Sequence, residues 1–500
     1  MNRSTIEQGR FLSPSTEDER AVVEAVEKEL LIAGRWRPAT DGHQLPVHDP
    51  STGEVLCHVA DAVPADAVAA LDAAAAAQLG WAKCPPRERS DILRRAFEQL
   101  IARADELALL MTLEMGKPLA ESKAEIVYAA EFLRWFSEEA VRIDGRYAVA
   151  PNGQGRLMVM KQPVGPCLLI TPWNFPMAMG TRKIGPAIAA GCSMVVKPAR
   201  ETPLSMLALA KILSDGGLPD GVLNVITSST AGEVTAPLIA DPRLRKMSFT
   251  GSTEVGRTLI AQSAHQVLRV SMELGGNAPF IVFDDADLDA AVEGAMIAKM
   301  RNIGEACTAA NRFLVAESIA ADFAERLAVR MRALKVGRGT EPGVQVGPLI
   351  TAKARDSMRA FVDDAGQRGG RVLAGGDALD GGGYYYQPTV IAGVDPGARV
   401  FREEIFGPIA PIASFSSEQE ALAIANSTEY GLAAYVYTSD MRRCFRVVEA
   451  LEFGMVGLNQ GIVSNPAAPF GGMKQSGVGR EGGREGIEEY LETKYVAANV

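Results

Sequence analysis

Histidine and cysteine are scarce in this chain, and their scarcity narrows the chemistry open to it. The 500 residues include 4 histidines and 6 cysteines. No two cysteines form a C-x-x-C pair and no histidines show H-x-x-x-H spacing, so we predict no metal site and no disulfide framework. A G-x-S-x-G motif is also lacking, which argues against Ser-His-Asp hydrolysis. Any catalysis is expected to proceed without histidine.

Long apolar runs and an excess of positive charge are missing as well. No uninterrupted apolar stretch reaches the ~18 residues that a membrane helix needs, and residues 1–20 lack the apolar centre of a secretory signal. The 61 acidic residues outnumber 51 basic ones, for a net charge of −10. An acidic surface is a poor match for nucleic acid. We expect a cytoplasmic protein that binds neither nucleic acid nor membrane.

What the chain does contain is a regular alternation of short apolar runs and helical patterns. Helices are expected over residues 64–78, 86–115 and 117–142, and strands such as CLLIT at 167–171 follow. These strands lack internal polar alternation, which is typical of parallel sheets covered on both faces. The alternation restarts after Gly276, with a strand and then a helix over 288–304. We therefore predict an α/β fold with two doubly wound Rossmann-like domains.

Three segments resemble phosphate-binding loops. GSTEVGRT (251–258) is a near Walker A motif with Arg257 at the lysine position, which favours anion contact at a helix start over nucleotide hydrolysis. KPARETP (197–203) follows a strand, where open α/β sheets bind ligands. GVGREG (477–482) lies too near the end of the chain for a βαβ unit and is interpreted as a loop.

Three polar residues stand at strand or helix ends in apolar or glycine-rich surroundings: Asn174 in TPWNFP, Glu273 in MELGGN and Cys307 in NIGEACTAANR. Taken singly, each has an ordinary structural explanation as a turn amide, a solvated carboxylate or a packed thiol. Together they supply an oxyanion donor, a general base and a nucleophile. With a nucleotide site in the same chain, this set predicts oxidation of an aldehyde through a thiohemiacetal and a thioester.

Six motifs carry a resemblance to a known family: TPWNFP, FTGSTEVG, ELGG, the flanks of Cys307, EEIFGP (403–408) and PFGGMKQSGVGRE (469–481). In order and approximate spacing they resemble the aldehyde dehydrogenase superfamily, and within it most of all the succinate-semialdehyde dehydrogenases. The resemblance implies an enzyme that uses NADP or NAD without a metal, and that forms homodimers or homotetramers. It also implies an NAD(P)-binding domain (1–144 and 163–272), a catalytic domain (273–470) and a small β oligomerisation element (145–162 and 485–500).

The resemblance assigns roles residue by residue. The catalytic residues are Cys307, Glu273 and Asn174. The cofactor-binding residues are Thr171, Trp173, Lys197, Arg200, Gly251, Ser252, Gly256, Glu404 and Phe406. The residues for the distal carboxylate of the substrate are Arg182, Arg301 and Ser464. An arginine fork suits a carboxylate because it binds both oxygens, although a salt bridge is the alternative for each arginine.

Three positions depart from the family pattern. Arg200 stands where NAD-preferring members have glutamate, and Glu201 is expected to point elsewhere, so NADP is favoured over NAD. Ala309 stands where some relatives have a second cysteine, so no local disulfide with Cys307 is expected. Glu305 stands where glutamine is common, and we expect it to point outward, since an inward carboxylate would oppose thiolate formation.

Other functions remain open from the sequence. Glutarate semialdehyde differs from succinate semialdehyde by one methylene, so an enzyme for that aldehyde, or one of broad specificity, is the first alternative. A non-catalytic relative and a P-loop-like nucleotide hydrolase are more remote.

Overall fold

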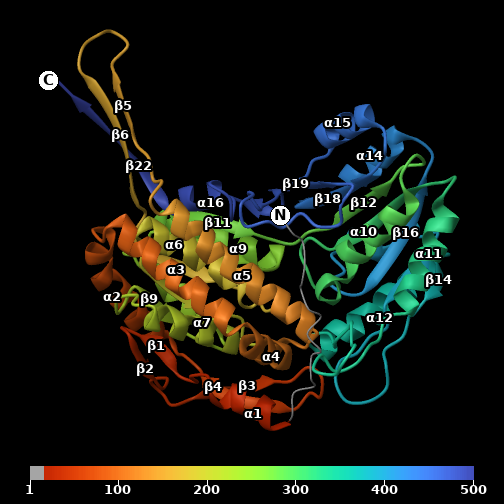
Figure 1. The fold of residues 1–500 in the computed structure, drawn as a ribbon, viewed down its shortest axis with the longest axis horizontal. Helices are drawn as coiled ribbons and strands as arrows, with labels where there is room; N and C mark the ends of the chain where they lie inside the picture. Colours follow the sequence, from red (N-terminus) through yellow and green to blue (C-terminus); the bar gives the residue numbers. More distant parts are fainter. Residues whose placement is uncertain (1–15, 500) are drawn as a thin grey trace, which may run out of the picture.

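Two large sheets dominate the computed structural model, which describes residues 16–499 (Figure 1). The first has eight strands in the order β2 (Arg35–Arg37), β1 (Leu30–Ile32), β9 (Leu223–Val225), β8 (Met194–Lys197), β7 (Cys167–Ile170), β10 (Lys246–Thr250), β11 (Arg269–Glu273) and β21 (Gly477–Val478). The five central strands, which are β9, β8, β7, β10 and β11, run parallel to one another. Strand β1 pairs antiparallel with β9 on one side, and β21 pairs antiparallel with β11 on the other.

The second sheet has seven strands in the order β14 (Arg371–Ala374), β15 (Thr389–Ala392), β16 (Ile409–Phe415), β13 (Ala310–Ala316), β12 (Ala278–Val282), β18 (Ala433–Tyr437) and β19 (Met455–Leu458). All its neighbours pair in parallel except β14. The predicted α/β class with two doubly wound sheets is therefore confirmed. The division of labour between a cofactor domain and a catalytic domain stays a prediction.

Helices pack around both sheets (Figure 1). Those in the first half of the chain are α1 (Thr16–Glu24), α2 (Pro64–Ala82), α3 (Pro86–Ala102), α4 (Ala104–Met115), α5 (Leu119–Glu139), α6 (Ala178–Ala190), α7 (Leu204–Asp215), α8 (Ala231–Ala240) and α9 (Thr253–Ser263). Those in the second half are α10 (Leu288–Met300), α11 (Ala320–Arg332), α12 (Ala352–Gln367), α13 (Arg399–Arg402), α14 (Glu418–Asn426), α15 (Met441–Ala450) and α16 (Glu485–Glu488). Across residues 16–499, no helix is long and apolar enough to cross a bilayer.

Two helix predictions were wrong in their extent. The segment 86–115 forms two helices, because Arg103 between them has non-helical angles of φ −105° and ψ 18°. The helix expected over 288–304 ends at Met300, and a 3₁₀ turn follows over Arg301–Gly304. The early end matters because this turn leads directly to Cys307.

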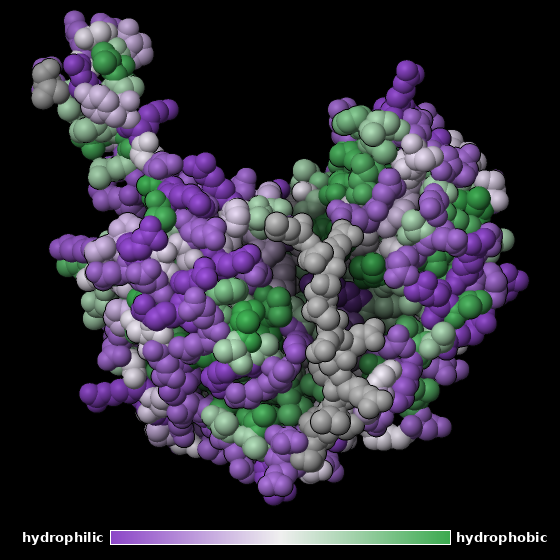
Figure 2. Space-filling view, viewed as in Figure 1, coloured by the Kyte–Doolittle hydropathy of each residue, from purple (hydrophilic) through white to green (hydrophobic). Residues whose placement is uncertain are grey.

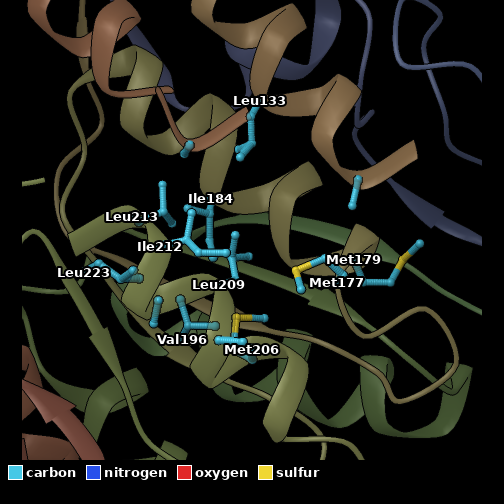
Figure 3. Close-up of a cluster of buried hydrophobic side chains, with 14 of the residues drawn as sticks. Leu133, Met177, Met179, Ile184, Val196, Met206, Leu209, Ile212, Leu213 and Leu223 are labelled. Carbon is cyan, nitrogen blue, oxygen red and sulfur yellow. The ribbon is translucent and has the colours of Figure 1, made fainter. Parts of the chain in front are cut away.

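The core of the first sheet explains its unbroken apolar strands. Val196 belongs to one buried cluster and its neighbour Val195 to another, so alternate residues of β8 fill opposite faces of the sheet. Figure 3 shows the first cluster, in which Ile184 of α6 and Ile212 of α7 lie over the strands. Each such side chain is buried at a gain of about 1.5–3 kcal/mol relative to exposure. The result is a rigid base beneath the loops at the strand ends.

A three-stranded arm projects away from both sheets (Figure 1), in the order β22 (Leu491–Ala498), β6 (Arg156–Pro163) and β5 (Arg146–Val149). It carries apolar side chains in contact with solvent: Tyr147 is 66% exposed, Tyr495 59% and Met160 45%. Figure 2 shows hydrophobic surface along this arm. Its outer strands β5 and β22 have unpaired edges, which favour association with another chain.

Two smaller sheets complete the fold. One is the hairpin of β3 (Gln44–His48) with β4 (Val55–Ala60), and the other pairs β17 (Tyr430–Gly431) antiparallel with β20 (Met473–Lys474), which lies far from it in the sequence. The segment 477–482 was expected to be a loop, but its first residues form β21 beside β11. A Cβ on Gly477, which has φ +129°, would lie 1.8 Å from the carbonyl oxygen of Met272. Only glycine therefore allows this strand to lie against Glu273.

Candidate active site

Three loops bring the predicted catalytic residues to one cavity. Asn174 follows β7, Glu273 is the last residue of β11, and Cys307 precedes β13. All three line a cavity of about 250 Å³. Other residues of its wall include Trp173, Gly251, Ser252, Glu404 and Phe406. Asn174 and Glu273 thus lie at the carboxyl ends of two parallel strands of the first sheet, where open α/β sheets bind ligands, and Cys307 reaches the same cavity from the amino end of β13 in the second sheet.

Cys307 is half-buried in a tightly packed loop. Its carbonyl oxygen would lie 2.3 Å from a Cβ on Gly276, so the two chain segments approach closely because residue 276 is glycine. The hydroxyl of Tyr435 donates to the carbonyl of Thr308 at 2.9 Å. These contacts fix the backbone on both sides of the thiol.

Asn174 is oriented by hydrogen bonds at both ends of its amide. Its Oδ1 accepts from the backbone N–H of Phe175 at 3.1 Å, and its Nδ2 donates to the carbonyl of Glu305 at 3.0 Å. An amide nitrogen carries two hydrogens, so the second remains for a ligand in the cavity. The geometry suits donation to an oxyanion formed beside Cys307.

Glu273 is buried among charged groups. Among residues 16–499, neither of its carboxyl oxygens has a hydrogen-bond partner. Burial raises the pKa of this carboxyl well above its usual range, and the nearby Glu481 raises it further, while Arg182 acts in the opposite direction. Glu481 itself is held by Lys183 at 2.5 Å and Arg182 at 2.9 Å. This environment favours the protonated form of Glu273 more than water would, as suits a group that exchanges protons during a reaction.

The Cys307 thiol also resists ionisation. Burial raises its pKa to about 12, and the positive charge of Arg182 is the largest opposing influence. A thiol in this state needs a base to take its proton before it can attack. Glu273, the predicted general base, lines the same cavity as Cys307.

A second cavity of about 450 Å³ continues from the first, because Trp173 and Gly251 line both. Its wall includes the predicted cofactor residues Thr171, Lys197 and Arg200. Lys197 is 5% exposed, and burial lowers its pKa to about 8.

Ser252 and Gly256, both in the predicted GSTEVG turn, have different structural roles. Ser252 caps α9, with its Oγ accepting from the N–H of Val255, and it lines the 250 Å³ cavity. Gly256 instead packs on Leu274, whose Cδ2 would lie 2.4 Å from an added Cβ. Gly256 thus permits α9 to lie close to the segment after Glu273.

The expectation that Glu201 points away from the cofactor cleft was wrong. Glu201 lines the 450 Å³ cavity together with Arg200, and the Nε of Arg200 donates to Glu201 Oε1 at 3.0 Å. The two side chains pair because Arg200 is largely exposed and free to turn toward its neighbour. The arginine charge at this end of the cleft is therefore partly neutralised.

The other predicted cofactor residues lie near the thiol. Glu404 accepts from the backbone N–H of Gly276 at 2.9 Å, and burial raises its pKa to about 7. The rings of Phe406 and Trp173 meet edge to face at 5.3 Å. These aromatic rings form one wall of the 250 Å³ cavity.

A third cavity, of about 580 Å³, contains two of the three predicted carboxylate-binding residues. In it, Arg301 Nη1 donates to the Oγ of Ser464 at 3.4 Å, and its guanidinium lies 4.8 Å from the ring of Phe175. Arg182 is placed differently: it lies 3.8 Å over Phe470 and pairs with Glu481. Its Nη2 lies 2.9 Å from Glu481 Oε2, whereas its Nε has no hydrogen-bond partner within residues 16–499. The buried Nε is therefore the donor that remains available to an anion.

The expectation that Glu305 points outward was also wrong. Glu305 is fully buried, and its Oε1 accepts from the backbone N–H of Ile350 at 3.2 Å. Burial raises its pKa well above the usual range. Burial therefore favours the neutral form of this carboxyl, which opposes the Cys307 thiolate less than an ionised group would.

Comparison with known proteins identifies the family of this chain. The profile of the "Aldehyde dehydrogenase family" matches residues 36–496. The chain belongs to the aldehyde dehydrogenase family.

Individual relatives agree with this assignment of an aldehyde dehydrogenase. The succinate-semialdehyde dehydrogenase of Paenarthrobacter nicotinovorans is 60% identical over 88% of this chain and 98% of its own length. The glutarate-semialdehyde dehydrogenase of Pseudomonas putida KT2440 is 51% identical over 95% of this chain and 98% of its own. A crystal structure described as an E. coli NADP-dependent enzyme superposes with a TM-score of 0.94 at 50% identity, covering 95% of this chain and 98% of that one. The predicted family and enzyme class are confirmed.

Sequence reasoning missed several residues of this aldehyde dehydrogenase site. Lys117, Glu121 and Glu125 contact the loops that carry Asn174 and Cys307. The available signal was their spacing of four residues across the start of a helix, which places them on one face. Asn302 was missed too, and its tolerance of a left-handed backbone was the only cue.

Proposed function

We propose that this aldehyde dehydrogenase oxidises succinate semialdehyde, or a close ω-carboxy aldehyde, to the dicarboxylic acid. The observation that carries the proposal is the convergence of Cys307, Glu273 and Asn174 on one cavity that continues into a nucleotide-sized cleft. Arg301 and Ser464, adjacent in a further cavity, supply donors for the distal carboxylate. Two relatives named for semialdehydes of this kind support the substrate class.

The residues present fit a nicotinamide dinucleotide. Lys197 is a buried cation with a lowered pKa, and Glu404 is a buried carboxyl facing the other cavity, so each benefits from a polar ligand group. The start of α9, capped by Ser252, offers backbone N–H groups to a pyrophosphate. Arg200 favours the additional phosphate of NADP, and the similar E. coli structure is described as NADP dependent. We propose NADP as the preferred cofactor.

In the proposed mechanism, Arg301 and Ser464 hold the substrate carboxylate so that the aldehyde carbon lies beside Cys307. Glu273 in its ionised form removes the thiol proton, and the sulfur attacks the carbonyl carbon. The second Nδ2 hydrogen of Asn174 stabilises the resulting oxyanion. A nicotinamide bound in the 250 Å³ cavity supplies the acceptor for the hydride.

The second half of the reaction releases the acid from Cys307. Once Glu273 has released the thiol proton to solvent, its carboxylate removes a proton from water, which attacks the thioester carbonyl, and the oxyanion again accepts from Asn174. Collapse of this intermediate breaks the carbon–sulfur bond and leaves the dicarboxylic acid. Because Glu273 is poised to hold a proton, it returns one to the departing thiolate.

The direct test is the appearance of reduced nicotinamide, followed by absorbance, with succinate semialdehyde and either NADP or NAD. We expect turnover by the wild type, none by Cys307→Ala, and unchanged turnover by Cys84→Ser, which alters another half-buried thiol. Both variants should unfold at the wild-type temperature. An inactive wild type with both cofactors would favour a non-catalytic relative.

Glutarate semialdehyde is the second candidate substrate, favoured by the 51% identical relative from Pseudomonas putida. One additional methylene changes binding by only ~1–3 kcal/mol. The ratio of kcat/KM for the C4 and C5 semialdehydes decides between them.

We also propose a homodimer or homotetramer, in which the arm formed by β5, β6 and β22 contacts a second copy. The exposed apolar side chains and unpaired edges of this arm support the proposal. Met160→Lys on the arm should shift the sedimentation profile toward the monomer, whereas a wild-type monomer would contradict it. A cytoplasmic location stays a prediction.

A further inference from the structure

We propose that three charged residues at the start of α5 position the oxyanion site. They are Lys117, two positions before the helix, and Glu121 and Glu125 within it. Glu121 holds the cysteine loop, and Lys117 with Glu125 holds the Asn174 loop. The inference rests on the proposed function, because it assigns a positioning role in that same reaction. Lys117, Glu121 and Glu125 line the 580 Å³ cavity together with Arg301, and none of them was assigned above a contact with the reacting atoms or the cofactor.

The first half of this arrangement is a buried ion pair beneath Asn174. Lys117 Nζ donates to Glu125 Oε2 at 2.5 Å and to the backbone carbonyl of Asn174 at 2.7 Å. Lys117 is 1% exposed, and its ammonium lies 4.3 Å from the ring of Phe175. Three contacts therefore tie this one cation to the segment that carries the oxyanion donor.

Glu125 extends the same hold to the next helix. Its Oε1 accepts from the backbone N–H groups of Met177 and Ala178 at 3.0 and 3.1 Å. Those N–H groups lie at the start of α6, where backbone donors have no partner within the helix. The segment between Asn174 and α6 is thus fixed at one end by Lys117, two positions before α5, and at the other by Glu125 of α5.

The second half concerns the loop that carries the thiol. The backbone N–H of Asn302 donates to Glu121 Oε2 at 2.7 Å. Asn302, Ile303 and Gly304 all have positive φ, at +53°, +62° and +79°. Left-handed geometry is unfavourable for a β-branched residue such as Ile303. An external contact is needed to hold this turn, and Glu121 supplies one.

Asn302 then connects the two loops. Its Nδ2 donates to the carbonyl of Asn174 at 3.0 Å and to the carbonyl of Glu305 at 2.9 Å. The Glu305 carbonyl also accepts from the Asn174 side chain. Glu121 therefore acts on the separation between the oxyanion donor and Cys307 through Asn302, without touching either.

A purely structural role for Glu121 predicts a different outcome, namely lost stability and an equal loss of rate in any background. A double-mutant cycle separates the two, since residues that act through one group have non-additive effects. Glu121→Ala, Glu121→Asp and Glu121→Gln are made in the wild type and in Asn174→Ala. Glu138→Ala is the matched control, because Glu138 lies on α5 and is half exposed.

Steady-state and single-turnover rates with succinate semialdehyde, cofactor affinity and unfolding temperature are measured for every variant. We expect Glu121→Ala to lower kcat about 10-fold with KM and cofactor affinity unchanged, since the affected interaction acts in the transition state. In Asn174→Ala the same change should alter kcat less than about 2-fold. Glu121→Gln keeps an acceptor for Asn302 and should retain more than about a third of wild-type kcat.

Glu121→Asp keeps the charge but withdraws the carboxylate, so it should behave like Glu121→Ala and serves if that variant does not fold. Equal losses in both backgrounds, or a glutamine variant no better than alanine, would overturn the inference while the proposed function stands. A wild type without aldehyde oxidation would overturn both.

Discussion

The side-chain amide of Asn174 donates to the backbone carbonyl of Glu305, two residues before Cys307, at 3.0 Å. Asn174, the proposed oxyanion donor, is therefore bound to the same loop that carries Cys307, the proposed nucleophile. A fixed donor costs no reorganisation when negative charge develops at the carbonyl oxygen. The rate of this aldehyde dehydrogenase should accordingly depend on how well that loop is held.

The first prediction concerns the ionisation of Cys307. Because burial raises the thiol pKa to about 12, the thiolate fraction should rise about tenfold per pH unit between pH 7 and 10 in the ligand-free enzyme. The rate of alkylation by iodoacetamide should follow it. Arg182→Met removes the main influence that lowers this pKa and should slow alkylation at each pH, whereas Arg94→Met, at the surface, should not. A rate that levels off below pH 9 would contradict this.

The second prediction concerns recognition of the distal carboxylate. Arg301→Met should lower kcat/KM for succinate semialdehyde about 100-fold and for butanal less than about 3-fold, because only the former carries a carboxylate to pair with the guanidinium. Ser464→Ala should cost about 3- to 10-fold. Arg330 lines the same cavity but is already paired with Glu293 at 2.6 Å, so Arg330→Met is the control. Equal losses for the charged and uncharged aldehydes would refute the role of Arg301.

The third prediction concerns the choice between NADP and NAD. Arg200→Ala should lower kcat/KM for NADP about 10- to 100-fold and leave NAD nearly unchanged. Glu201→Gln should act in the opposite direction, since it releases Arg200 from its ion pair and removes a negative charge near the additional phosphate. Steady-state kinetics with both cofactors check the pair of variants. If Glu201→Gln weakened NADP use, the proposed competition between Glu201 and phosphate would be wrong.

The fourth prediction concerns stability and pH through Glu305. Its pKa is raised in the folded protein, so the folded state binds this proton more tightly than the unfolded state does. The stability that this proton on Glu305 provides is fully present at pH values below the pKa of Glu305 in the unfolded chain. It decreases as the pH rises toward the pKa of Glu305 in the folded protein. Glu305→Gln does not titrate and can retain the acceptor for Ile350. The free energy of unfolding of Glu305→Gln minus that of wild type should increase from pH 5 to pH 8, by up to about 1.4 kcal/mol per pH unit.

Urea unfolding at several pH values measures this difference. Cys84→Ser, which leaves Glu305 in place, should follow the wild-type pH dependence. A constant difference across that range would show that Glu305 ionises alike in the folded and unfolded states.

Much of the fold was predictable because the signals were local. The unbroken apolar strands at 167–171 and 278–283 predicted parallel sheets, and β7 and β12 are such strands. The break at Arg103 was not predictable, since neither a proline nor a glycine stands at that position to signal it. The early end of α10 was missed because the residues of the following turn include Ile303, a residue that sequence rules keep out of left-handed turns.

The site divides in the same way. The candidates Asn174, Glu273 and Cys307 could be singled out because each is a polar residue within three positions of a glycine or proline and close to the end of an element. The orientations of Glu201 and Glu305 were predicted wrongly, because both depend on partners supplied by the fold, namely the guanidinium of Arg200 and the backbone N–H of Ile350. The contact between Glu121 and Asn302 joins residues 181 positions apart, and no local pattern reports such a pair.

The 580 Å³ cavity has two unlike walls. Charged residues of α5 and Arg301 form one, while the aliphatic side chains of Met296, Ile297, Leu334, Val344 and Ile462 form much of the other. The hydrogen bonds that hold the loops of Asn174 and Cys307 to this cavity come instead from Lys117, Glu121 and Glu125. Directed evolution of a biocatalyst for longer or bulkier acids should therefore randomise the aliphatic wall and leave α5 as it is.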